Sequence, residues 1–175
     1  MYVKLNNKCT IIVQIYERMI KMIQSFINTS TPLVSNTSSV QFQNDCIVTN
    51  SARNCNPYSW LCHNEGSANY DIVKGGLYEI DFDATISALT AGTIAFQLFS
   101  NGEPIPGTLM AETIAAAGDT ADIGINKKIK VCCNGNTTIS VRAVPLVENI
   151  ATPATPITTQ VPTILNANFS ISKKA

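Results

Sequence analysis

The stretch GGLYEIDFDATIS, residues 75–87, alternates between apolar and polar side chains along almost its whole length. Its apolar side chains, apart from Leu77, are Tyr78, Ile80, Phe82, Ala84 and Ile86. The residues between them are Glu79, Asp81, Asp83, Thr85 and Ser87. Because successive side chains of a β-strand point to opposite faces, this alternation predicts a long strand with one buried face and one acidic face.

Other stretches of strand character surround this segment. We expect strands near residues 33–42, 70–73, 77–89, 93–100, 108–114, 121–125, 128–133, 137–144 and 168–172. Turn signals such as Asn101-Gly102 separate them, and no helical pattern lies between them. This order predicts a mainly β protein, an antiparallel jelly-roll sandwich, and argues against a parallel sheet with crossover helices. The residues expected to fill its core are Tyr78, Ile80, Phe82, Phe96, Leu98, Val141 and Phe169.

The beginning of the chain carries a pattern of a different period. Spacings of four and three residues alternate through Leu5, Cys9, Ile12, Tyr16, Met19, Ile23 and Phe26. Such a heptad seam predicts an α-helix, and further apolar residues off the seam make its apolar surface wider than a coiled coil needs. We expect residues 1–30 to form a helix for anchoring or trimerisation, and residues 31–175 to form the jelly-roll domain. The alternative is a helix that folds back on its own domain. The residues expected to serve the helix are Leu5, Ile12, Ile15, Tyr16, Met19, Met22, Ile23 and Phe26.

Composition excludes some classes of function. The formal net charge is zero and only 14% of residues are charged, so no long-range field favours nucleic acid or a membrane surface. No stretch has the run of about 18 apolar residues that spans a membrane, and no secretory signal is evident. For a protein made without a signal we expect the six cysteines to be free and buried rather than paired, and the alternative is a disulfide formed after release from the cell.

Four stretches of residues 70–175 resemble the tumour necrosis factor-like jelly roll, in particular its bacterial and phage members. They are GGLYEIDFDATIS, TIAFQLFSNGEPIPGT, KVCCNGNTTISVRAV and NANFSISKKA. The resemblance implies a compact homotrimer, with the last of these stretches as a central strand. The cysteine-bearing loop of residues 43–69 and the Pro/Thr-rich stretch of residues 148–163 have no counterpart in the family.

Catalytic and metal chemistry have little support in the sequence. His63 is the only histidine, and its neighbour Cys62 would point to the opposite face of a strand, so the two do not form a dyad. Cys46, Cys55, Cys62 and His63 lack the usual spacing of zinc ligands. We therefore expect no enzyme activity, no cofactor and no metal.

The acidic face of residues 79–83 admits two interpretations. The simpler one is a solvated face whose charges are answered by basic side chains on other strands, for which Lys128, Lys130 and Arg142 are the candidates. The alternative is a calcium ion held by Glu79, Asp81 and Asp83.

The resemblance leads to a structural hypothesis for function. We expect a trimeric virion surface protein, a head fibre or capsid decoration knob of a bacteriophage, attached to a capsid or other particle protein through its N-terminal helix. The first alternative is a spore-surface or extracellular adhesive subunit. The second is a carbohydrate-binding module that would bind a host-surface glycan through Tyr58, Trp60 and Tyr70.

Overall fold

The computed structural model describes residues 22–47, 60–132, 136–146 and 160–174, and of Cys46 and Ile47 it describes the backbone alone. Every regular element in these ranges is a β-strand, and no helix there is long and apolar enough for a membrane crossing. The strands are β1 (Met22–Ile27), β2 (Thr31–Pro32), β3 (Asn44–Ile47), β4 (Leu61–Cys62), β5 (Tyr70–Ile72), β6 (Gly76–Ser87), β7 (Gly92–Ser100), β8 (Glu103–Pro104), β9 (Met110–Ile114), β10 (Thr120–Val131), β11 (Thr137–Ala143) and β12 (Thr163–Lys173).

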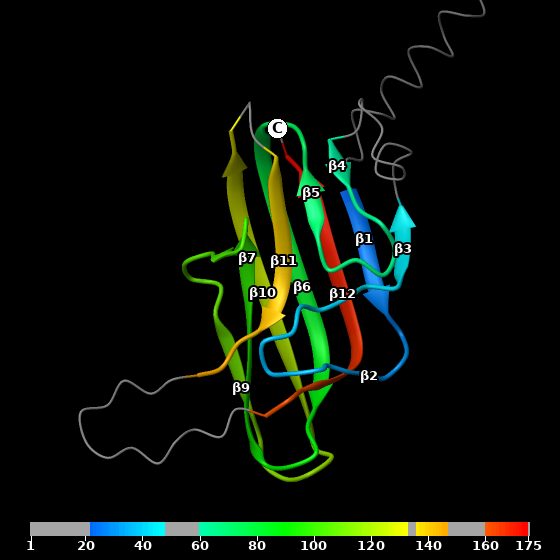
Figure 1. Cartoon of the computed structure of the whole chain (residues 1–175), viewed down its shortest axis with the longest axis vertical. Coiled ribbons are helices and arrows are strands. Elements are labelled where there is room, and N and C mark those ends of the chain that lie inside the picture. The colour runs from blue at the N-terminus through cyan, green and yellow to red at the C-terminus, as the bar shows by residue number, and fades with distance from the viewer. Residues whose placement is uncertain (1–21, 48–59, 133–135, 147–159, 175) are drawn as a thin grey trace, which may run out of the picture.

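The strands form two antiparallel sheets that pack face to face (Figure 1). Sheet A has the order β10-β6-β12-β1-β3, with β2 added at one end of β12. Sheet B has the order β4-β5-β11-β7, and β8 and β9 share the far edge of β7 at its opposite ends. Apart from β4 with β5 and β7 with β8, strands that pair in these sheets are not consecutive along the chain, as a jelly roll requires. The mainly β, antiparallel part of the predicted fold is confirmed.

The alternating stretch is β6, which lies between β10 and β12 in sheet A. Along it, buried side chains alternate with partly or fully exposed ones from Tyr78 to Ile86. Its register pairs Phe82 with Phe169 of β12 on one side and with Ile125 of β10 on the other. The apolar face therefore lies in the sandwich, and the acidic face lies on the outside of sheet A.

Aromatic and aliphatic side chains from both sheets fill the space between them. The Phe82 and Phe96 rings are 5.7 Å apart between centroids, and those of Tyr70 and Phe169 are 4.5 Å apart. At most 1% of the surface is exposed for Tyr78, Ile80, Phe82, Phe96, Leu98, Val141 and Phe169.

The prediction of a helix is wrong for residues 22–27, which form β1. Ile23, Ser25 and Ile27 are buried and alternate with partly exposed residues, so the period is two. β1 lies between β12 and β3 and pairs with both, which satisfies its backbone on two edges. Sheet pairing has overridden the helical spacing, since short apolar runs fit either period. The domain boundary predicted after residue 30 is misplaced as well, because sheet A already begins at Met22.

The remaining residues of the predicted helix lie outside the described ranges. They are Leu5, Ile12, Ile15, Tyr16 and Met19. Of the rest, Met22, Ile23 and Phe26 belong to β1.

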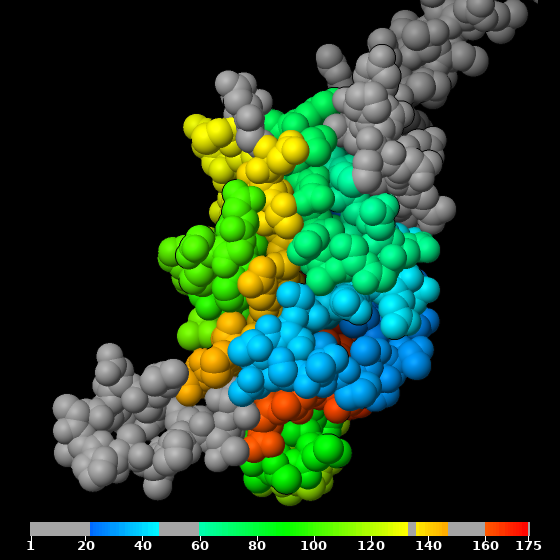
Figure 2. Space-filling view, viewed as in Figure 1, coloured from blue at the N-terminus to red at the C-terminus, as the bar shows by residue number. Residues whose placement is uncertain are grey.

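The predicted strand at residues 33–42 is mostly an irregular segment. Beyond β2 it makes one isolated bridge, between Ser39 and Arg142 of β11. Two backbone hydrogen bonds flank it, from Val40 N to Val141 O at 2.9 Å and from Ala143 N to Ser38 O at 3.0 Å. The segment crosses the front of the molecule (Figures 1 and 2).

A further difference concerns the two strands expected at residues 121–125 and 128–133. They are one strand, β10, which pairs with β6 without interruption from Thr120 to Val131. The polar residues Asn126 and Lys127 do not break it, because β6 offers partners along the full length.

Candidate functional site

The outer face of sheet A carries a dense set of polar side chains. Glu79, Asp81 and Asp83 project from β6, flanked by polar residues of β10 and β12. Glu79 contacts two lysines, Lys174 with Nζ at 2.5 Å from Oε2 and Lys128 with Nζ at 3.8 Å from Oε1. This end of the acidic face is therefore neutralised by lysines of the same chain.

The next carboxylate along β6, that of Asp81, accepts hydrogen bonds from uncharged groups. Asp81 accepts hydrogen bonds from the Asn126 amide of β10 and from the Ser170 hydroxyl of β12. No three acidic, histidine or cysteine side chains of the described residues form a metal-binding group. Glu79 and Asp81 thus have hydrogen-bond and ion-pair partners within the chain.

The basic residues that were expected to neutralise the acidic face do not all lie beside it. Lys128 contacts Glu79, while Lys130 makes no hydrogen bond or ion pair with a described residue. The Arg142 guanidinium is on sheet B, 4.5 Å above the centre of the Phe99 ring. Lys174, which the sequence did not single out, makes the shorter contact because the C-terminal strand lies next to β6.

We expect substitution of Lys174 by Ala to raise the pKa of Glu79 toward the ordinary carboxyl range. In the structure the hydrogen bond from Lys174 is the main cause that lowers the pKa of Glu79, and Lys128 adds a smaller effect. Because the folded-state pKa is lowered, the interaction stabilises the fold above the ordinary carboxyl range and is lost as pH falls. Carboxyl-carbon NMR titration measures the shift. Lys130→Ala is the control and should leave it unchanged; equal shifts in the two variants would contradict the assignment.

The other end of the same face is hollowed. A depression of about 340 Å³ is lined by Asp83, Ala84, Thr85, Asp122, Ile123, Gly124, Asn166, Ala167 and Asn168. A Cβ at Gly124 would lie 3.0 Å from Asp83 Oδ1, so glycine keeps the depression open. The Thr85 hydroxyl donates to Asp122 at 2.7 Å, whereas Asp83 is exposed and its side chain makes no hydrogen bond or ion pair with a described residue. The hollow thus presents acceptors to a donor from outside.

His63 is buried and cannot serve a nucleophile. Its Nδ1 lies 2.8 Å from Asp45 Oδ2, and its Nε2 lies 3.2 Å from the backbone oxygen of Ser67. Both ring nitrogens are therefore occupied by acceptors, and neither faces a hydroxyl or thiol to activate. The arrangement has an acid and a histidine, but not the base–nucleophile contact of a hydrolase.

Cysteine pairing differs from the expectation of free thiols. Cys62 is disulfide-bonded, which removes it as a zinc ligand, while Cys132 is free and exposed. The side chains of Cys46 and Cys55 lie outside the described residues.

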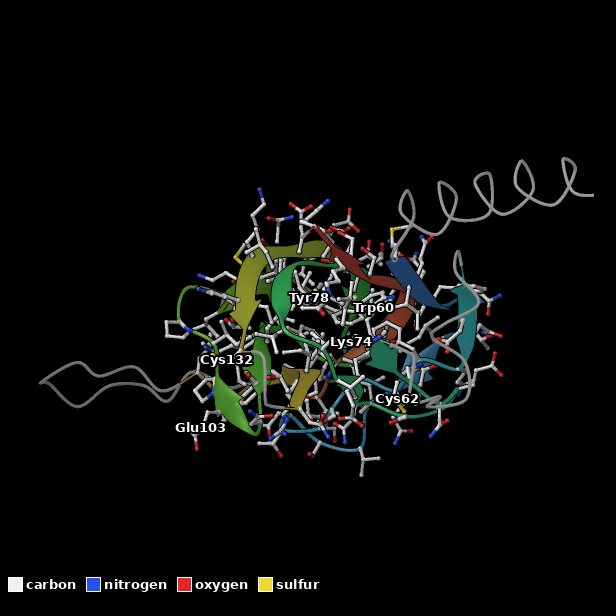
Figure 3. The ribbon with its side chains drawn as sticks, turned by 90° about the horizontal axis from the view of Figure 1, so that it is seen from above. Trp60, Cys62, Lys74, Tyr78, Glu103 and Cys132 are labelled. Atoms are coloured by element: carbon white, nitrogen blue, oxygen red, sulfur yellow. The ribbon has the colours of Figure 1, made fainter. Side chains whose placement is uncertain are left out.

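The proposed glycan platform is contradicted by burial. Trp60 is 4% exposed and Tyr70 is 1% exposed, so neither ring can stack on a sugar, and Tyr58 lies outside the described residues. Trp60 stacks on Tyr78 with centroids 5.6 Å apart, at the end of the sandwich seen from above in Figure 3. Burial raises the pKa of Tyr78 to about 12. These aromatics belong to the core.

Comparison with known proteins identifies the fold. The sequence matches no protein-family model and no curated protein. Among solved structures, the globular domain of the zebrafish complement 1qA protein is similar, with a TM-score of 0.50 and 6% sequence identity. The similarity covers 89% of this chain and 98% of that one. At this identity the match shows the fold alone, a jelly roll of the tumour necrosis factor-like type.

Proposed function

We propose that the chain is a non-enzymatic structural subunit that assembles as a homotrimer and projects from a virion as a head fibre or capsid decoration knob. Residues 1–21 would attach it to a capsid protein. The observation that carries the proposal is the free edge of sheet A. β10 is a strand of 12 residues, and no described strand pairs with its outer edge.

An exposed edge of that length is a site for pairing with other chains unless it is protected. Beside it, across the corner between the sheets, Leu109 and Met110 are 47% and 41% exposed at the start of β9. Apolar side chains next to an open edge favour coverage by another subunit. The family resemblance implies that this subunit is a second copy of the chain in a trimer.

The contacts of the buried histidine and of the outer-face carboxylates support a structural role as well. The only histidine has both nitrogens occupied by acceptors, and the described carboxylates of the outer face are mostly paired with lysine, amide and hydroxyl groups of the same chain. Side chains arranged in this way hold a surface in place. A knob needs such a rigid surface more than it needs a reactive group.

One observation favours the alternative of a spore-surface or other extracellular adhesive subunit. Cys62 is disulfide-bonded, and disulfides persist in oxidising surroundings. The exposed thiol of Cys132 could join neighbouring subunits there. A virion released from its host meets the same oxidising surroundings, so disulfide formation fits both hypotheses. The two hypotheses differ in the particle that carries the protein.

Sedimentation tests the assembly. The full chain should sediment as a trimer at micromolar concentration, and the double variant Leu109→Asp/Met110→Asp should sediment as a folded monomer, because charges would be buried at the interface. Val34→Asp is the matched control, since Val34 is 94% exposed and lies in the irregular segment after β2. A monomeric full chain would refute the proposal, and a trimeric double variant would move the interface away from β9 and β10.

A further inference from the structure

One carboxylate on the outer face of sheet A lacks a partner among the described residues. The other carboxylates of this face, on Glu79, Asp81 and Asp122, contact lysine, amide or hydroxyl groups of the same chain. No described side chain donates a hydrogen bond to Asp83 or forms an ion pair with it. The carboxylates of this face are otherwise paired, so Asp83 is the exception.

The register of the sheet explains why Asp83 has no partner on β10. The residue opposite Asp83 is Gly124, which has no side chain to offer. Four residues further along the same two strands, Lys128 lies opposite Glu79 and contacts it. The position that holds a lysine beside Glu79 is therefore an open space beside Asp83.

This open space is the hollow of about 340 Å³ between β6, β10 and β12. Its lining contains the carboxylates of Asp83 and Asp122, two asparagine side chains and no basic residue. An ammonium group carries a positive charge and three hydrogen-bond donors, which suits a site of this kind. A lysine Nζ in the hollow would repeat the contact that Lys174 makes with Glu79 at 2.5 Å on the same face.

The N-terminal segment, residues 1–21, has the charge that the hollow needs. It contains four basic residues and one acidic residue, a net charge of +3, and because the whole chain is neutral, residues 22–175 carry −3. Opposite charges favour contact between the segment and the sandwich. The basic residues are Lys4, Lys8, Arg18 and Lys21, and the acidic one is Glu17.

The point where this segment joins the sandwich puts the hollow within its reach. Met22 lies opposite Ser172 of β12, which lies opposite Glu79 of β6. From Met22, Asp83 is two strands across and four residues along, about 16 Å at ordinary strand spacings. Lys8 precedes Met22 by 14 residues, and an extended chain covers about 3.5 Å per residue, so its side chain reaches the hollow easily.

We infer that the hollow binds the ammonium group of Lys4 or Lys8 of the same chain, paired with Asp83, and so docks the N-terminal segment on the outer face of sheet A. This docking is independent of the proposed assembly. It has one consequence that rests on the proposed function. A segment that lies on the sandwich is not available to a capsid protein, so docking and attachment would compete.

Carbodiimide cross-linking of the full chain tests the contact. The reagent activates a carboxylate, and a lysine amine in contact with it forms an amide while the reagent leaves as a urea. Mass spectrometry of the digest should find Asp83 joined to Lys4 or Lys8. The Glu79–Lys174 pair is the internal control, because its charged atoms are 2.5 Å apart. Cross-linking of this control pair without any product from Asp83 would overturn the inference.

Isotope labelling distinguishes the source of the lysine. Nitrogen-15-labelled and unlabelled chains are mixed, refolded together and then cross-linked. Products of Asp83 with both peptides from one chain are expected. Products that only join a labelled chain to an unlabelled one would overturn the assignment to the same chain.

Proteolysis gives a second measurement that does not depend on the cross-linker. Asp83→Asn should speed tryptic cleavage after Arg18 by about two- to fivefold, the change expected for loss of one exposed ion pair. Gly124→Lys should do the same, because it supplies Asp83 with a lysine from β10. Glu103→Gln is the matched control, since Glu103 is an exposed carboxylate on β8 of the other sheet. Cleavage of Asp83→Asn at the wild-type rate would overturn the docking.

Discussion

Deletion of residues 1–27 is expected to abolish cooperative folding, although the heptad pattern marks this part of the chain as a separate helix. The deletion removes β1 from between β12 and β3 and leaves backbone groups of both strands without partners. It also removes Ile23 and Ile27, each worth about 2–5 kcal/mol when truncated to Ala in a core. Folded domains have about 5–15 kcal/mol in total, so the remainder should not fold.

The matched variant ends just before the strand. Deletion of residues 1–21 leaves β1 intact, and this protein should fold, form trimers and fail to co-sediment with particles that lack the wild-type protein. Circular dichroism with urea denaturation measures folding, and pelleting with particles measures attachment. A cooperative transition after deletion of residues 1–27 would contradict the role of β1. Undiminished particle binding after deletion of residues 1–21 would place attachment on the sandwich.

Substitution of Phe169 by Ala should lower the free energy of unfolding by about 3–5 kcal/mol. Phe169 of β12 is fully buried, and its ring centroid lies 5.4 Å from that of Phe42 and 4.5 Å from that of Tyr70. Phe169, which belongs to sheet A, thus contacts a ring of sheet B (Tyr70) and a ring of the irregular segment that crosses the front (Phe42). Truncation leaves a cavity where three parts of the fold meet, and the surroundings cannot collapse easily.

Urea denaturation of Phe169→Ala beside Ser172→Ala gives the comparison. Ser172 lies three residues further along β12, on the outer face, and its truncation should cost less than about 0.5 kcal/mol. A loss of less than about 1 kcal/mol for Phe169→Ala would mean that the core repacks around the missing ring. A larger loss for Ser172 would mean that the outer face contributes more to stability than hydrogen bonding there indicates.

The sequence predicts the fold well where the apolar side chains follow a single spacing over many residues. In β6 the alternation runs through nine residues from Tyr78 to Ile86, and only a strand in a sandwich buries every second one. The Asn101-Gly102 turn is confirmed too. Both residues have left-handed φ, 53° and 87°, and they join β7 to β8 as an Asn-Gly hairpin should.

β1 shows why the prediction failed for other parts of the fold. Ile23 and Phe26 fit the heptad, while Ile23 and Ile27 fit both a helix and a strand with a buried Ser25 between them. A polar residue on the buried face hides the alternation, and Ser25 is buried because it donates to Asp45. That partner comes from a segment 20 residues away and cannot be inferred from local periodicity.

The same limit applies to the candidate site. The acidic face follows from the alternation, and Lys128 follows as its cross-strand neighbour. Asp45 and His63 are 18 residues apart in a stretch without clear pattern, and only the pairing of β1 with β3 brings the carboxylate to the ring. The one available signal was that a single histidine shares this stretch with an aspartate.

The pairing of the first described strand with the last one has a consequence for how the chain can be reconnected. Met22 lies opposite Ser172, so β1 begins at the end of the sandwich where β12 finishes. A short linker from Lys174 to Met22 could join them, with new ends opened at the exposed Asn101-Gly102 turn. Such a circular permutant keeps every neighbour in both sheets. It would place the chain ends at the hairpin between β7 and β8, and so change where a fused partner is displayed without changing the fold that displays it.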